Sequence, residues 1–182
     1  MSDDWPQRVF RERLAQPDRV SCGATCLVVA RMIEDHEYGE YVGAADSVPD
    51  RFRAEVLAMH RRVTAPVDAG RLQVPWPRAL GTPPWAVARE LGGRDVRWIR
   101  TTPGAGYDAA AAATRERVPV PVYVGSRWLP RHVVLALGEV DGCLRVFEPS
   151  RGRLVDVTRS SFVSSRLGLA GWDHPWWAVL PG

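Results

Sequence analysis

The first half of the chain carries hydrophobic residues at helical spacing. Within residues 21–34 apolar side chains recur every three or four positions, and Ser21 is suited to cap the helix that they predict. This segment is apolar on most of its faces, so we expect it to lie at the centre of the molecule. The same spacing predicts a helix over residues 50–62 with Asp50 as its N-cap, and a third helix over residues 82–91.

The second half alternates between short β-rich runs and turn residues. One alanine-rich helix is predicted over residues 107–117, and a short one begins at Thr158 or Ser160 and ends near residue 167. Asp141-Gly142 between two apolar runs is a strong hairpin signal. Strands are predicted at residues 95–100, 118–125, 132–138, 144–148, 153–158 and 176–180.

Helices followed by strands that hairpins join predict an α+β fold with a mostly antiparallel sheet. The chain has 182 residues, of which 46% are hydrophobic and 25% charged, which suits one folded domain. We expect a single domain over residues 1–182, with a helical part at about 20–92 and a sheet part at about 95–181. No apolar run reaches the roughly 18 residues that a membrane helix needs, so no membrane contact is expected.

Charge and cysteine usage narrow the class of protein. The formal net charge is only +3, all 24 basic residues are Arg, and no basic stripe with interleaved aromatics is present, so nucleic acid is not an expected partner. The first residues lack an apolar signal region and three Cys make no disulfide framework, so the cytoplasm is the expected compartment. The chain contains no Asn, so any residue that orients a catalytic base must be Asp or Glu.

Cys22 has the setting of a nucleophile. It stands at the predicted start of the first helix, where the helix dipole and backbone N–H groups favour a thiolate. Those N–H groups can also donate to a developing oxyanion, and Gln16, six residues upstream, can supply a second donor. Gly23 allows close approach of a substrate backbone. The alternative for any free Cys is an inert buried thiol, which is our expectation for Cys26.

A base and an orienting acid are found on two consecutive predicted strands. His132 begins the apolar run at residues 132–138, and a base on a rigid strand facing a nucleophile on a rigid helix suits nucleophilic catalysis. Glu148 ends the next strand, which the hairpin turns back beside the first. A carboxylate there can accept a hydrogen bond from the imidazole and fix its tautomer.

These motifs resemble those of the peptidase C39-like proteins, a family of papain-like cysteine peptidases. Gln16-x5-Cys22-Gly23-Ala24-Thr25 is similar to the family's Gln-x5-Cys-Gly-Pro/Ala signature. His132-Val-Val-Leu-Ala-Leu-Gly138 and Arg145-Val-Phe-Glu148-Pro149-x2-Gly152 resemble its His-x-V-x-V-x-G…V-x-D-P-x-x-G block. The resemblance covers residues 16–162. It implies a papain-like fold with Cys22 as nucleophile, His132 as base, Glu148 as orienting acid and Gln16 as oxyanion donor.

The sequence departs from this family in two places. The third catalytic residue is usually Asp in the family, and Glu148 is one methylene longer. The segment between nucleophile and base, with its Pro- and Trp-rich stretch at residues 66–85, is also longer than in compact members, so substrate specificity does not follow from the resemblance.

Several rivals remain open on sequence alone. His174 competes with His132 as base, and Asp141 and Asp156 compete with Glu148. A zinc site built from Cys22, Cys26, Cys143 and a His lacks paired Cys-x2-Cys spacing. Residues 104–109 match G-x-G-x-x-A but lack the ribose-binding carboxylate of a dinucleotide site. No cofactor or metal is therefore expected. We expect His36 and His60 to be solvated.

The expected function is a cysteine peptidase that cleaves a peptide or protein substrate through an acyl-enzyme. Acyl transfer or deamidation by the same triad is an alternative, as is a catalytically silent domain that binds a peptide. A delivered effector or toxin is a sub-hypothesis of the peptidase. The sequence does not fix the substrate or the oligomeric state.

Overall fold

The fold consists of helices followed by an antiparallel sheet. The structure is a computed structural model that describes residues 12, 14–68, 71–72, 76–77 and 81–182. In chain order its elements are α2 (Cys22–Glu34), α3 (His36–Gly43), α4 (Val48–Thr64), β1 (Val67–Asp68), β2 (Arg71–Leu72), α5 (Pro84–Glu90), β3 (Asp95–Trp98), α6 (Pro103–Arg115), β4 (Val120–Gly125), β5 (Pro130–Val140), β6 (Cys143–Glu148), β7 (Arg153–Thr158), α7 (Arg159–Val163) and β8 (His174–Leu180).

Six strands form the main sheet in the order β3-β8-β4-β5-β6-β7, and each neighbouring pair is antiparallel. Strands β4 to β7 follow one another along the chain, and short turns connect each to the next. Strand β8 lies between β3 and β4. The predicted α+β class is therefore confirmed. Asp141 and Gly142 both have positive φ, as a tight two-residue hairpin turn between β5 and β6 requires.

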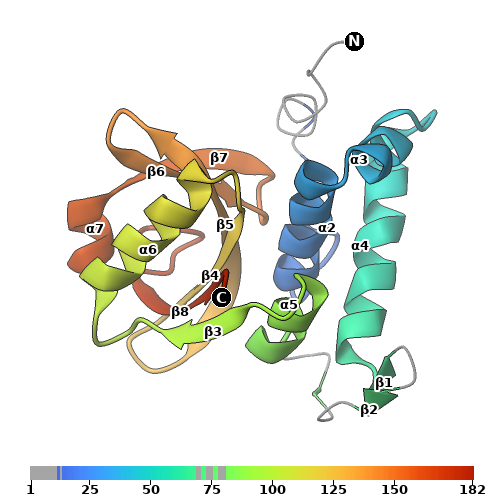
Figure 1. Cartoon of the computed structure of the whole chain (residues 1–182). Coiled ribbons are helices and arrows are strands. Elements are labelled where there is room, and N and C mark those ends of the chain that lie inside the picture. The colour runs from blue at the N-terminus through green and yellow to red at the C-terminus, as the bar shows by residue number, and fades with distance from the viewer. Residues whose placement is uncertain (1–11, 13, 69–70, 73–75, 78–80) are drawn as a thin grey trace.

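Helices cover both faces of this sheet (Figure 1). Side-chain alternation along β5 assigns the faces. Val133 and Leu135 join the apolar cluster of α2, α4 and α5, while Val134 and Ala136 join the cluster of α6 and α7. The sheet is thus the middle of three layers.

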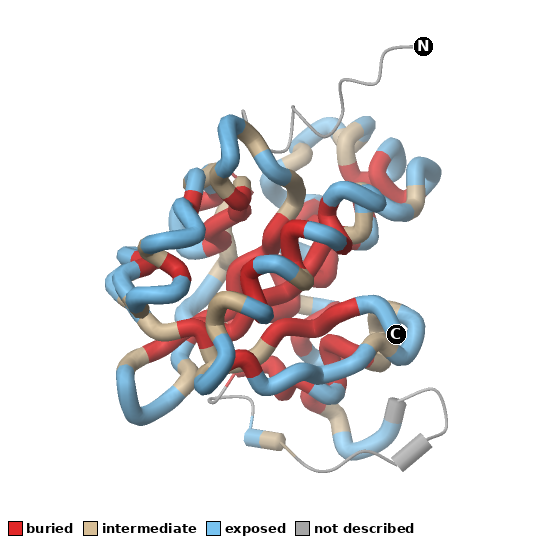
Figure 2. The backbone as a smooth tube through the Cα atoms, turned by 60° about the vertical axis from the view of Figure 1, so that its left-hand side comes forward, coloured by how far each residue is buried: buried red, intermediate tan, exposed pale blue. Residues whose placement is uncertain are grey.

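The central helix is α2, as its apolar composition predicts. Ten of its 13 residues are buried, and burial in the molecule follows the strands and the helix surfaces that face them (Figure 2). Its end at Glu34 matches the prediction, and Ser21 is the N-cap residue, although its side chain makes no capping hydrogen bond.

Three helix starts differ from the prediction. Helix α5 begins at Pro84, two residues later than predicted. Helix α4 begins at Val48 because Ser47, rather than Asp50, is the N-cap, and its hydroxyl accepts from the Asp50 N–H. Helix α6 begins at Pro103, which fits the first turn because a proline there has no N–H to leave unpaired.

The structure corrects two further expectations from sequence. Helix α3 was not predicted, because its sequence is short, contains two Gly and has few apolar residues. His60 is buried at 6% exposure rather than solvated, since it lies on the inner side of α4, while His36 is exposed as expected. The Pro- and Trp-rich stretch lies partly outside the described residues.

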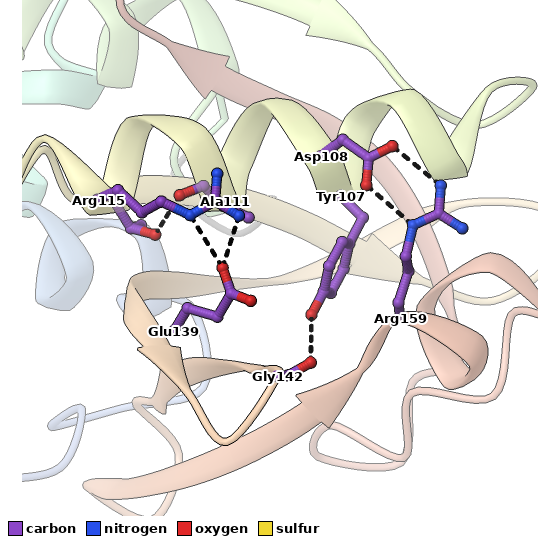
Figure 3. Close-up of polar contacts among 8 residues, drawn as sticks. Tyr107, Asp108, Ala111, Arg115, Glu139, Gly142 and Arg159 are labelled. Atoms are coloured by element: carbon purple, nitrogen blue, oxygen red, sulfur yellow. Dashed lines mark hydrogen bonds and ion pairs between the residues drawn. The ribbon is translucent and has the colours of Figure 1, made fainter.

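The glycine pattern at the start of α6 has a packing role. A Cβ on Gly106 would lie 2.7 Å from the Cβ of Ile99, so glycine lets the helix approach the end of β3 closely. Polar contacts then join the helix to its neighbours (Figure 3): Asp108 pairs with Arg159 of α7 at 2.9 Å, and Arg115 pairs with Glu139 of β5 at 2.8 Å. Packing against Ile99 therefore accounts for the second glycine of the G-x-G-x-x-A pattern.

Among the residues described, no helix is both long and apolar enough to cross a membrane.

Gly106→Ala should destabilise the fold. Alanine normally favours a helix over glycine by about 1 kcal/mol, but the clash with Ile99 should outweigh this and cost about 1–3 kcal/mol. Gly43→Ala is the matched control, because its added Cβ has no neighbour within 4 Å, and it should leave stability unchanged or raised. Urea unfolding of both variants checks this, and equal effects would contradict the packing argument.

Candidate active site

Three predicted residues meet at one place in the fold. Cys22 begins α2, His132 lies near the start of β5, and Glu148 ends β6. Because β5 and β6 are antiparallel, the start of one and the end of the other lie at the same end of the sheet. All three side chains are nearly inaccessible to solvent, at 5%, 6% and 0% exposure.

The His132 imidazole connects the other two side chains. Its Nε2 lies 2.9 Å from Glu148 Oε1, and the Cys22 side chain lies close enough to the ring to raise the pKa of the imidazole. Since Nε2 is taken by the carboxylate, Nδ1 is the nitrogen available to the sulfur. The order of contacts is therefore thiol, imidazole, carboxylate, which is the order that a nucleophile, a base and an orienting acid require.

This arrangement shifts the pKa of both the base and the acid. Burial acts to lower the pKa of His132, but hydrogen bonds to Cys22 and Glu148 outweigh it and raise the pKa from 6.5 to about 9. Burial acts to raise the pKa of Glu148, but hydrogen bonds from His132 and Ser150 outweigh it and lower the pKa from 4.5 to about 2. The pair is therefore charged at neutral pH.

Ser150 is a site residue that the sequence analysis missed. Its backbone N–H donates to Glu148 Oε1 at 2.7 Å, and its hydroxyl donates to Oε2 at 2.8 Å. A short polar side chain two positions beyond a carboxylate is a known turn pattern, so a local signal for Ser150 was available. These bonds fix the carboxylate in the orientation that faces His132.

The alternative acids and base from the sequence analysis make other contacts in the structure. Asp156 makes two 2.8 Å contacts with Arg145, and Asp141 belongs to the hairpin turn. His174 lies beside Arg100; burial and the nearby arginines lower its pKa. In the described part of the chain, no three His, Cys, Asp or Glu side chains are placed to hold a metal ion.

Gln16 is brought to the site by its backbone. Its N–H donates to the Pro149 carbonyl at 2.8 Å, which joins the segment before the nucleophile to the residue after Glu148. Its side-chain Nε2 donates to the Asp18 carbonyl at 2.6 Å, and one N–H of the amide remains for another acceptor. Its Oε1 is buried and has no hydrogen-bond partner within the described residues.

Helix α2 is anchored to the strand that carries the base. The Cys26 thiol, one turn beyond Cys22, donates to the Val133 carbonyl at 3.5 Å. Burial raises the pKa of Cys26 well above its ordinary value, with smaller contributions from Cys22 and Glu148. Cys26 is thus a core residue, as expected, and its contact sets the spacing between α2 and β5.

A second anchor holds the start of α2 from the other side. The Tyr123 hydroxyl on β4 donates to the Thr82 carbonyl at 2.8 Å, and the Thr82 side chain fills the space where a side chain on Gly23 would lie, with its Cβ 2.7 Å from that position. Gly23 is therefore required by packing. No local sequence pattern indicates the Thr82 and Tyr123 contacts.

No protein-family model, curated protein or solved structure matches this chain.

The pH dependence of stability should report the His132–Glu148 pair. The raised pKa of His132 stabilises the fold fully below pH 6.5, and this contribution is lost as the pH rises through about 9. The lowered pKa of Glu148 stabilises it above pH 4.5, and this contribution is lost as the pH falls toward about 2. Between pH 4.5 and 6.5 both contributions are complete.

Glu148→Gln should therefore destabilise the protein most between pH 4.5 and 6.5, and less above pH 9. Urea unfolding across this range measures the difference from wild type. Glu139→Gln is the control, because Glu139 pairs with Arg115 rather than with a histidine, and its effect should not peak in this window. A similarly flat effect for Glu148→Gln would show that the charged pair does not form.

Proposed function

We propose that this protein is a cysteine peptidase with a papain-like, C39-like fold that hydrolyses a peptide or amide bond through a Cys22–His132–Glu148 triad. The observation that carries the proposal is a single buried imidazole that hydrogen-bonds a buried carboxylate and interacts with a thiol at a helix N-terminus. The packing of α2, which begins with Cys22, on an antiparallel sheet supports a papain-like fold.

Acylation begins from the thiolate–imidazolium form of the pair, in which His132 holds the Cys22 proton. The sulfur attacks the substrate carbonyl carbon, whose oxygen becomes an oxyanion. Cys22 begins α2, so its N–H has no acceptor within the helix and can donate to that oxygen. The remaining amide N–H of Gln16 is the proposed second donor. Because the pKa of His132 is about 9, the ring is protonated at neutral pH and gives its proton to the leaving amine as the C–N bond breaks.

Deacylation returns the site to its starting state. His132, now neutral, takes a proton from water, whose oxygen attacks the thioester carbon. The C–S bond breaks, the acid product leaves, and the proton stays on His132, which restores the thiolate–imidazolium pair. Glu148 stays ionised throughout, and it stabilises the imidazolium and fixes its orientation.

Thiol labelling tests the activated pair without a known substrate. Iodoacetamide at mildly acidic pH should modify the wild type once, at Cys22, as measured by intact mass and peptide mapping. Cys22→Ala should abolish this fast labelling, and His132→Ala should slow it by about tenfold or more, since reactivity follows the thiolate population. Burial keeps Cys26 unreactive.

Two variants are matched controls for the labelling. Cys143→Ala removes the partly exposed thiol, and His174→Ala removes the rival imidazole; both should label like wild type. Labelling spread over several thiols, or unchanged by His132→Ala, would contradict the triad and favour a peptide-binding domain without catalysis.

Gln16→Ala separates oxyanion stabilisation from thiol activation. It should lower the turnover of a fluorogenic peptide library by about 10²–10³-fold, the usual cost of losing one oxyanion donor. Cys22 labelling by iodoacetamide should be unchanged, because alkylation forms no oxyanion. Unchanged turnover would remove Gln16 from the mechanism, and slowed labelling would assign it a structural role.

A further inference from the structure

Two large apolar side chains project into solvent immediately before the proposed base. Trp128 is 71% exposed and Leu129 is 52% exposed, in the turn between β4 and β5 and within four residues of His132. Hairpin turns are normally polar. Exposed apolar residues that cluster beside a site point to a binding surface.

The turn is built to hold these side chains in place. The Ser126 hydroxyl accepts from the backbone N–H groups of Trp128 at 3.2 Å and Leu129 at 3.1 Å, and the Ser126 N–H donates to the Leu129 carbonyl at 3.0 Å. A Cβ on Gly125 would collide with the backbone of Leu129 and Pro130, so the two sides of the turn are in close contact. A surface fixed in this way loses little entropy on binding.

The apolar surface continues onto the edge of the sheet. Trp176 on β8 donates its indole N–H to the Ser126 carbonyl at 3.0 Å, and its ring lies 5.4 Å from that of Trp98 on the edge strand β3. Trp98 is 44% exposed. We call Trp98, Trp176, Trp128 and Leu129 the tryptophan strip.

The strip is flanked by positive charge. The Arg100 guanidinium lies 5.4 Å from the Trp176 ring and donates to the Arg127 carbonyl at 3.3 Å, while the Arg127 guanidinium lies 4.3 Å from the Trp128 ring. Both arginines act electrostatically on His174, whose Nδ1 is buried without a hydrogen-bond partner in the described structure.

One carboxylate lies near these cations but is engaged elsewhere. Asp173 acts electrostatically on His174, and its Oδ1 accepts from the Gly168 backbone N–H at 3.0 Å. Arg131, next to His132, is also exposed. The excess of guanidinium groups over carboxylates favours an acidic ligand.

Ring contacts connect the strip to the nucleophile. The Trp177 ring lies 5.4 Å from that of Trp98 and 5.9 Å from that of Tyr123. The buried Tyr123 hydroxyl is close enough to Cys22 and Cys26 that both act on its pKa, which burial raises well above its ordinary value. Ring contacts thus run from the strip to the buried residues beside Cys22.

We propose that the tryptophan strip binds an aromatic or aliphatic side chain of the peptide substrate, and that Arg100 and Arg127 bind a carboxylate beside it. This proposal rests on the proposed function for the identity of the ligand as substrate. The strip selects the peptide, and the triad cleaves it.

Peptide selection tests the strip without turnover. The full chain carrying Cys22→Ala, which binds but does not acylate, is used to select from a random linear peptide library displayed on phage. The selected sequences should share an aromatic or aliphatic residue next to Asp or Glu. Adding Trp128→Ala should weaken binding of a selected peptide by about tenfold or more, measured by fluorescence anisotropy.

Charge is tested separately. Arg127→Gln should weaken binding and reduce its salt dependence. Tyr41→Ala and Arg61→Gln are the controls: Tyr41 is 48% exposed on α3, Arg61 is exposed on α4, and neither should change binding. The proposed role of the strip is wrong if no common motif is selected, or if the chain with both Cys22→Ala and Trp128→Ala binds the peptide as well as the chain with Cys22→Ala alone.

The labelling experiment distinguishes the two proposals. Trp128→Ala in the otherwise unchanged chain should leave Cys22 labelling by iodoacetamide at the wild-type rate, because the strip does not touch the thiol–imidazole pair. Normal labelling with a peptide motif that is independent of Trp128 would overturn the strip alone. Slow, unselective labelling with Trp128-dependent binding would overturn the peptidase and retain the strip as a binding surface.

Discussion

The candidate site depends on one electrostatic constraint, the burial of the Glu148 carboxylate. An ionised carboxylate with no exposed surface is stable only if its oxygens accept several hydrogen bonds. Three donors are available, one from His132 and two from Ser150. The turn after β6 therefore determines where the carboxylate points, and the carboxylate determines the orientation of the imidazole. The longer side chain of Glu, compared with Asp, is accommodated by these bonds.

The same turn positions the segment that precedes the nucleophile. The Pro149 carbonyl accepts a hydrogen bond from the Gln16 N–H, so the segment before Cys22 is joined directly to the residue after Glu148. On the helix side, Cys26 bonds the backbone of β5 and Thr82 packs against Gly23. These contacts all act on the backbone or on buried groups, so the distance between sulfur and imidazole is set by the rigid parts of the fold.

Much of this arrangement could be predicted from sequence, because it rests on local patterns. Helical and strand periodicity located α2 and most strands, and Asp141-Gly142 located the central hairpin. That hairpin places Glu148 beside His132 through chain connectivity alone. The position of Cys22 at a helix start also follows from local spacing.

The rest depends on contacts between distant segments, which periodicity does not encode. Both His132 and His174 lie near the start of a strand, and the packing of α2 places Cys22 beside His132 rather than His174. His60 was expected in solvent because its neighbours in sequence are charged, yet its side of α4 faces the core. Likewise, β8 lies between β3 and β4 and so brings Trp176 against Trp98. No local sequence pattern in these strands predicts that placement.

The hydrogen bond between Gln16 and Pro149 has a consequence for how the protein acquires its chemistry. Its two partners come from the first tenth and the last fifth of the chain. Cys22 and Glu148 lie within a few residues of these partners, so they are similarly far apart in sequence. Local elements such as α2 form quickly, whereas pairings between distant segments wait for loop closure. In a nascent or partly folded chain Cys22 would therefore lack His132 and Glu148 as neighbours, and the three side chains would come together only when the sheet is complete.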